Sequence, residues 1–204
     1  MCTKYKIPLH SEINSTLKMV YTVENGRIKI KNFDSSTDQQ EFIKVYDNRL
    51  PDLSFLSVKG SLQNKTSTVF DPAQERGIIL SVQTVLRNNK YEFESANNIS
   101  VNYSPVMESI QLMVANVPFA HRYENPGSVN RLDVYIPADK VKALIPERIL
   151  NQVYRRQVLN LSTATNKFLS SLNEFLNMLT KELGKTESKS LSTYFENFIQ
   201  CITL

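Results

Sequence analysis

Two histidines and two cysteines are the side chains in this sequence best suited to metal binding or nucleophilic chemistry. His10 and His121 lie far apart, and neither has neighbouring ligands at metal-binding spacing. Cys2 and Cys201 lie one near each terminus. The sequence contains no CxxC pair, HExxH motif or EF-hand loop, which are the usual patterns of protein metal sites. We therefore expect no metal site and no cofactor.

His121 is the best enzymatic candidate, because Glu124 or Asp133 could hold it as a general base. The sequence supplies no nucleophile for such a base, and it has neither a GxSxG elbow nor a P-loop. Its 5 glycines offer little material for a loop that cradles phosphates. We therefore interpret His121 as a surface-loop histidine and predict a non-enzymatic protein without a small-molecule substrate.

The charge of the chain permits an alternative function. Its 204 residues include 24 Lys and Arg against 20 Asp and Glu, a net charge of +4. Dedicated nucleic-acid binders usually concentrate more charge on one face, and acidic residues are interspersed here, so an ordinary solvated surface is favoured. The alternative is a protein that binds RNA or single-stranded DNA through basic side chains on phosphates. These candidates are Lys18, Arg27, Lys29, Lys31, Arg155 and Arg156.

The sequence also indicates the cellular compartment of the protein. No run of apolar residues approaches the roughly 18 needed to span a membrane. Residues 1–20 are interrupted by Lys, Pro, His and Glu, so they lack the apolar core of a signal peptide. Two cysteines cannot form a disulfide framework, which favours a reducing environment. We expect an intracellular, cytoplasmic protein that is not secreted and has no transmembrane segment.

The elements that must position these residues change character near Pro146. Before it, short apolar runs alternate with turn signals every eight to twelve residues or so, which is typical of an all-β sandwich or barrel. The run 77–86 has little polar alternation, so we expect a central strand buried on both faces. Residues 116–127 resemble a long loop. The other expected strands are 41–46, 53–58, 91–94, 98–103, 109–117 and 131–136.

A β-hairpin over residues 17–33 is the clearest local prediction. Asn25 and Gly26 supply the two positive-φ positions that a type I′ turn needs. This turn predicts the cross-strand pairs Glu24–Arg27, Val23–Ile28, Thr22–Lys29, Tyr21–Ile30, Val20–Lys31 and Met19–Asn32.

The pattern becomes helical after residue 136. Pro137 can begin a short helix that ends at Leu144, and Pro146 can begin a longer one. We expect the longer helix to run over about 146–183, with a break at 162–166 as the alternative. A polar linker over 185–189 then leads to a terminal amphipathic helix over about 190–203. The predicted fold class is α+β, with an antiparallel β-sandwich or barrel over 1–136 and a helical region over 137–204.

Nine apolar positions in the predicted helices recur at helical spacing, and we call them the C-terminal stripe. They are Phe168, Leu172, Phe175, Leu179, Leu191, Tyr194, Phe195, Phe198 and Ile199. Such a stripe either folds back onto the β domain or docks on another copy or a partner, and we predict a homo-oligomer. The layout, a β-rich part followed by helices, is similar to that of small viral structural or accessory proteins. That resemblance implies a structural or interaction role.

Overall fold

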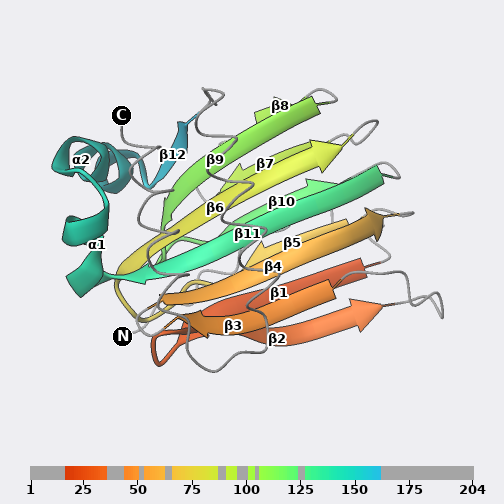
Figure 1. Cartoon of the computed structure of the whole chain (residues 1–204), viewed down its shortest axis with the longest axis horizontal. Helices are drawn as coiled ribbons and strands as arrows, with labels where there is room; N and C mark the ends of the chain where they lie inside the picture. Colours follow the sequence, from red (N-terminus) through yellow and green to blue (C-terminus); the bar gives the residue numbers. More distant parts are fainter. Residues whose placement is uncertain are drawn as a thin grey trace.

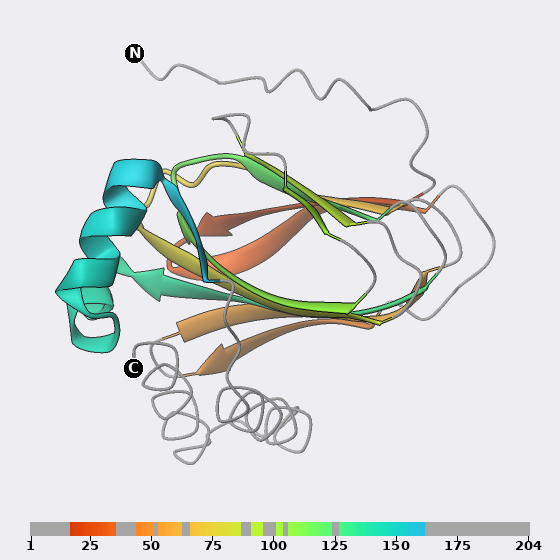
Figure 2. The same cartoon turned by 90° about the horizontal axis from the view of Figure 1, so that it is seen from above.

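In the part of the chain that the computed structural model describes, twelve strands form two stacked six-stranded sheets, with two short helices at one end (Figures 1 and 2). The described residues are 17–35, 44–50, 53–62, 66–86, 91–95, 101–103, 106–123 and 127–161. The C-terminal stripe, the terminal helix, His10 and both cysteines lie outside these ranges.

Each sheet mixes strands from distant parts of the chain. Sheet A has the order β2 (Arg27–Ser35), β1 (Leu17–Glu24), β5 (Thr66–Phe70), β10 (Phe119–Tyr123), β7 (Tyr91–Ser95) and β8 (Val101–Tyr103). Sheet B has the order β12 (Val158–Leu161), β9 (Val106–Val114), β6 (Gly77–Leu86), β11 (Gly127–Pro137), β4 (Leu53–Leu62) and β3 (Lys44–Leu50).

The strands from β4 to β11 form one antiparallel ribbon that is rolled into both sheets. The first pairs with the last, β4 with β11, and then β5 pairs with β10, β6 with β9 and β7 with β8. Pairing between turns of the roll joins β11 to β6 and β10 to β7. This is the topology of a jelly roll, so the predicted β-sandwich is confirmed as a β-rich fold.

The hairpin prediction is confirmed near the turn and is wrong farther away. Asn25 and Gly26 both have positive φ, and the pairs from Glu24–Arg27 to Tyr21–Ile30 form as expected. The register then shifts between Val20 and Tyr21, so Val20 lies opposite Asn32 rather than Lys31. Such a bulge adds one residue to one strand, which spacing from the turn alone cannot predict. Beyond the hairpin, β1 pairs with β5 in parallel, the one parallel pairing among the described strands.

Sheet B carries a cluster of apolar side chains on each face. Its inner face packs against sheet A, and Ile79 there joins a core that includes Phe70 and Phe119 of sheet A. Its outer face carries a second apolar cluster that contains no sheet A residue but includes side chains of both helices. The side chains of β6 whose burial is described, those of residues 77–83, are all buried. The strand lies between β9 and β11. The expected central strand is therefore confirmed.

The two helices begin as predicted, but the second ends early. α1 (Ala138–Leu144) and α2 (Glu147–Arg156) follow Pro137 and Pro146. The continuous helix expected over 146–183 is wrong, because Gln157 adopts a left-handed conformation and β12 follows. The physical reason is tertiary: β9 offers an edge to which residues 158–161 add. Sheet B therefore continues past residue 136. None of the described helices is long and apolar enough to cross a membrane.

Three strands were absent from the sequence prediction, β6 has the bounds predicted for it, and the others overlap the prediction with one or both ends shifted. Residues 116–127 were expected to be a loop, yet β10 forms over 119–123 between β5 and β7. The polar side chains of this segment and the prolines at 118 and 126 resemble those of a loop. Pairing with two neighbours and burial inside the roll override that local pattern.

Gly77, at the start of β6, provides a test of this packing. A Cβ built there would lie 2.5 Å from the Tyr135 ring and 2.6 Å from the Ile136 carbonyl oxygen. We expect Gly77→Ala to lower the free energy of unfolding by about 1–3 kcal/mol, because a close-packed strand must shift. Urea denaturation measures it, with Gln74→Ala, at an exposed position, as the control. An equal, small effect of both substitutions would contradict the close packing.

Candidate functional site

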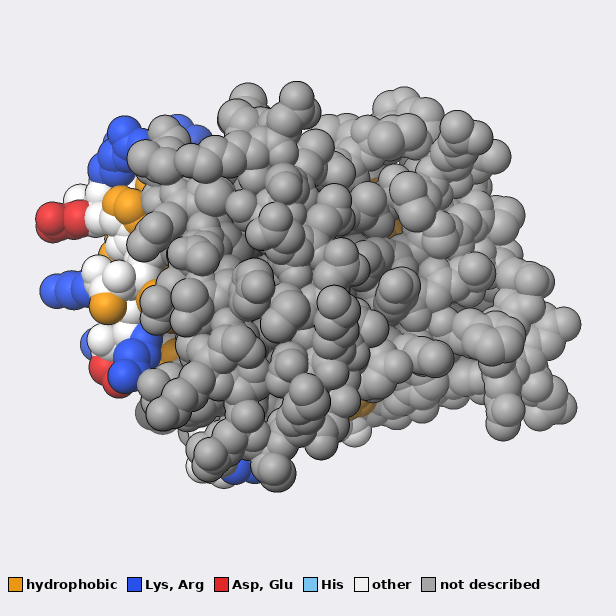
Figure 3. Space-filling model, in the orientation of Figure 1, with side chains coloured by type: hydrophobic (Ala, Val, Ile, Leu, Met, Phe, Trp, Pro, Cys, Tyr) orange, Lys and Arg blue, Asp and Glu red, His pale blue; other side chains and the backbone are white. Residues whose placement is uncertain are grey.

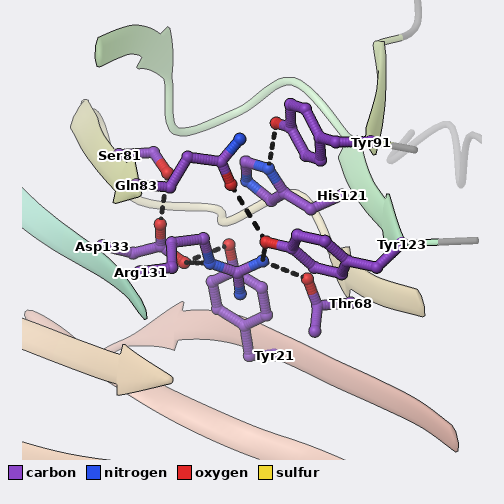
Figure 4. Close-up of polar contacts among 9 residues, drawn as sticks. All are labelled: Tyr21, Thr68, Ser81, Gln83, Tyr91, His121, Tyr123, Arg131 and Asp133. Carbon is purple, nitrogen blue, oxygen red and sulfur yellow. Dashed lines mark hydrogen bonds and ion pairs between the residues drawn. The ribbon is translucent and has the colours of Figure 1, made fainter. Parts of the chain in front are cut away.

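A cluster of polar side chains lies between the two sheets (Figure 4). Its members come from sheet A on one side and from β6 and β11 of sheet B on the other, and all are buried. The cluster, which we call the interior polar cluster, consists of Tyr21, Thr68, Ser81, Gln83, Tyr91, His121, Tyr123, Arg131 and Asp133.

An ion pair between Arg131 and Asp133 is the centre of this cluster. Both side chains are fully buried, and the Arg131 Nε lies 3.1 Å from the Asp133 Oδ2. The Asp133 carboxylate also accepts hydrogen bonds from the Tyr21 hydroxyl at 2.8 Å and from the Ser81 hydroxyl at 2.6 Å. Alternation along β11 places residues 131 and 133 on the same face, so one strand supplies both charges.

The Arg131 guanidinium is also held by sheet A. Its Nη1 donates to the Thr68 hydroxyl and lies 3.4 Å from the Tyr123 hydroxyl. The Tyr123 hydroxyl in turn donates to the Gln83 side-chain oxygen at 3.0 Å, which leads back to sheet B. The guanidinium also lies 5.9 Å from the centre of the Tyr21 ring, within range of a cation–π interaction. These contacts join the two sheets through polar groups.

His121, on β10, lies at the edge of the cluster among aromatic rings. Its Nδ1 is 2.7 Å from the Tyr91 hydroxyl, and the two rings stack with centroids 5.9 Å apart. Phe93 and Phe119 also pack against the imidazole. The surface-loop interpretation of His121 is therefore wrong, because the imidazole is completely buried on a strand.

Burial governs the protonation of this cluster. Burial lowers the pKa of His121 well below its ordinary value, and the nearby Arg131 charge lowers it further. The imidazole is therefore neutral at pH 7. Burial alone would lower the pKa of Arg131, but the Asp133 carboxylate together with the Tyr123 and Tyr21 hydroxyls raises it above its ordinary value. Burial, followed by the Asp133 charge, also raises the pKa of Tyr21.

The resulting site is sealed and balanced in charge. One buried cation faces one buried anion, and the imidazole beside them carries no charge. The His121 Nε2, the Arg131 Nη2 and both amide atoms of Gln111 are buried without a hydrogen-bond partner. The cluster holds no exposed nucleophile or base, and the described residues include no group of three or more candidate metal ligands. Its geometry is that of a polar core.

The sequence-predicted site residues do not come together there. Asp133 pairs with Arg131 rather than with His121, and the side chain of Glu124 lies outside the described ones. Sequence reasoning missed the role of Arg131. The alternation of Arg131, Asp133 and Tyr135 along one face of a predicted strand was a signal that could have revealed it.

The basic candidates are divided among three elements, β1, β2 and α2. On β2, Lys29 lies 3.2 Å from Glu24, and Lys31 lies 2.9 Å from Asp71. Arg155 and Arg156 lie in the last turn of α2, where a positive charge is favourable for the helix dipole. Around the end of the molecule formed by α1 and α2, basic side chains alternate with acidic ones (Figure 3). Arg27 is exposed, and the side chain of Lys18 lies outside the described ones.

The outer face of sheet B is the second candidate site, a surface rather than a pocket. It presents apolar side chains from the four central strands, and its described members on these strands include Phe55, Ile78, Leu80, Val82, Ile110, Leu112, Leu132, Val134 and Ile136. The outer face of sheet A differs, with Thr22, Ser67 and an Arg122–Glu94 ion pair. Among the described residues, sheet B therefore carries the larger apolar cluster on its outer side.

No family model and no curated protein matches this sequence. Similar solved structures include apo ToxT from Vibrio cholerae strain SCE256, at 13% identity and a TM-score of 0.49. That alignment covers 75% of this chain and 54% of ToxT, so this chain spans about half of the ToxT length.

Two further solved structures show similar levels of resemblance. ToxT from Vibrio cholerae O395, bound to (E)-4-(8-methylnaphthalen-1-yl)but-3-enoic acid, has 14% identity and a TM-score of 0.43, covering 74% of this chain and 58% of ToxT. An RmlC-like cupin protein from Desulfovibrio desulfuricans has 12% identity and a TM-score of 0.35, covering 48% of this chain and 85% of that protein. Likeness at this level assigns neither a family nor a function.

The Arg131–Asp133 pair predicts a non-additive response to substitution. Arg131→Met leaves the Asp133 carboxylate buried without its cation, and we expect a loss of about 3–5 kcal/mol in the free energy of unfolding. Arg131→Met combined with Asp133→Asn removes both charges and keeps an acceptor for Tyr21 and Ser81. The double variant should recover much of the loss in urea denaturation. A double variant no more stable than Arg131→Met would contradict this account.

His121 predicts a pH dependence of stability. Its pKa is lowered in the folded state, so below about pH 6.5 the unfolded chain takes up a proton that the folded chain rejects. Stability should therefore fall as the pH is lowered from 7 to 5, by at most about 1.4 kcal/mol per pH unit from this residue. His121→Asn, which keeps an acceptor for Tyr91, should flatten that fall. Parallel pH profiles for the two proteins would show that His121 is not responsible.

Proposed function

We propose that this chain is a non-enzymatic interaction protein that self-associates through the C-terminal stripe. The observation that supports the proposal is the outer face of sheet B. An apolar sheet face is the surface against which an amphipathic helix packs. The chain thus carries two complementary surfaces, the stripe and the face, and two copies can exchange them in a closed, symmetric contact.

The interior polar cluster supports a role without catalysis. A general base must reach its substrate within hydrogen-bond distance, directly or through one water. His121 is fully buried against three aromatic side chains and is neutral, and the only described carboxylate of the cluster is already paired with Arg131. This arrangement stabilises the sandwich and leaves recognition to the outside of the molecule.

The ion pairs of β2 favour self-association over nucleic-acid binding. Lys29 and Lys31 each already have a carboxylate partner, so a phosphate would have to compete with it. Arg155 and Arg156 are exposed, but they lie in the last turn of a helix whose dipole they complement. Binding of RNA or single-stranded DNA through these residues remains the alternative that the following experiment also tests.

Light scattering in line with size exclusion tests the proposal on the full chain. We expect the mass to rise from monomer to a defined oligomer with concentration. Phe175→Ser combined with Phe198→Ser should reduce association at least tenfold, because each large apolar contact contributes more than about 1 kcal/mol. Asn177→Ser combined with Asn197→Ser is the matched control, at polar positions of the same predicted helices.

The outcome is read from mass and absorbance together. A wild-type protein that stays monomeric at the highest concentration would overturn self-association. An excess of absorbance at 260 nm that disappears in high salt, as counterion release requires, would favour nucleic-acid binding instead.

A further inference from the structure

The outer face of sheet B is already buried within a single copy of the chain. None of the side chains named for this face exposes more than 4 % of its surface, although they spread over four neighbouring strands. Val134 of β11 lies opposite Leu80 of β6, and each of these two side chains exposes at most 1 % of its surface. Apolar side chains reach such low exposure only when other groups of the same molecule cover them.

The two described helices cover one end of the outer face of sheet B. α1 follows β11 directly and contacts β11 and β6, while α2 contacts β9 and β12. Figure 2 shows both helices at one end of the sandwich. With 7 and 10 residues, they are about 10 and 15 Å long, whereas the 10 residues of β6 extend for about 33 Å. The rest of the face therefore needs another cover.

The chain that follows β12 is suited to supply it. β12 is an edge strand of sheet B, so the chain passes Leu161 at the margin of this face. Four strands spaced by about 4.8 Å present a face wider than one helix, which is about 10 Å across, and two side by side would match it. The sequence after residue 161 predicts two amphipathic helices, one on each side of a polar linker.

We propose that the C-terminal stripe packs on the outer face of sheet B of its own chain, which keeps a single copy closed. This inference rests on the proposed function, because the same stripe is the surface through which copies associate. Association then requires the stripe to leave its own sheet and occupy that of a second copy, as in domain swapping. The short connection after β12 gives the intramolecular contact a high effective concentration, so the closed monomer prevails at dilution.

Carbene footprinting of the full chain, with mass spectrometry, tests this at a dilution where light scattering reports a monomer. We expect peptides over 168–179 and 191–199 to be labelled several-fold less in the monomer than in the urea-unfolded chain. Phe175→Ser combined with Phe198→Ser should increase labelling of 78–82 and 132–134 severalfold, and the Asn177→Ser and Asn197→Ser control should not. Continued protection of Tyr21 and Phe119, between the sheets, shows that the variant is folded.

The outcomes distinguish a failure of the closed-monomer proposal from a failure of the self-association proposal. A stripe that is labelled in the monomer and protected in the oligomer would overturn the closed monomer and leave self-association standing. A protected stripe in a protein that is monomeric at every concentration would support the closed form and overturn self-association. A stripe that is labelled at every concentration, with no oligomer, would overturn both.

Discussion

Both faces of sheet B carry apolar side chains, so the surroundings of the sheet must keep water from both. Sheet A covers the inner face, and its own outer face can therefore be polar, with Thr22, Ser67 and the Arg122–Glu94 pair. α1 and α2 cover one end of the outer face. Burying apolar side chains is favourable because it removes them from water. The rolled ribbon, α1 and α2, and the proposed position of the C-terminal stripe would each bury part of sheet B.

The interior polar cluster is the exception within this apolar arrangement. Burying Arg131 and Asp133 is costly in free energy, and the pair persists because each charge has the other and hydroxyl groups as partners. Its hydrogen bonds connect Tyr21 and Tyr123 of sheet A to Gln83 and Asp133 of sheet B. Polar contacts of fixed geometry can specify how the two sheets align, which apolar packing alone does less strictly.

The relation between a closed copy and an associated one follows from the same surfaces. A stripe that fits a sheet face within one chain fits the identical face of a second chain equally well. The balance between the two states then depends on the connection after β12 and on concentration, rather than on new contacts. The proposed interaction role requires no open pocket.

Local chemistry in the sequence determined the hairpin turn at Asn25 and Gly26, the central strand whose side chains are buried over 77–83, and the helix starts after Pro137 and Pro146. These features depend on backbone φ preferences and on periodicity, which short segments carry by themselves. Only the tertiary structure decided that residues 119–123 and 158–161 are strands, that His121 is buried, and that Tyr21 meets Asp133. Those outcomes depend on which strand edges and side chains the rolled ribbon brings together, and such long-range pairings leave no local signal in a single sequence.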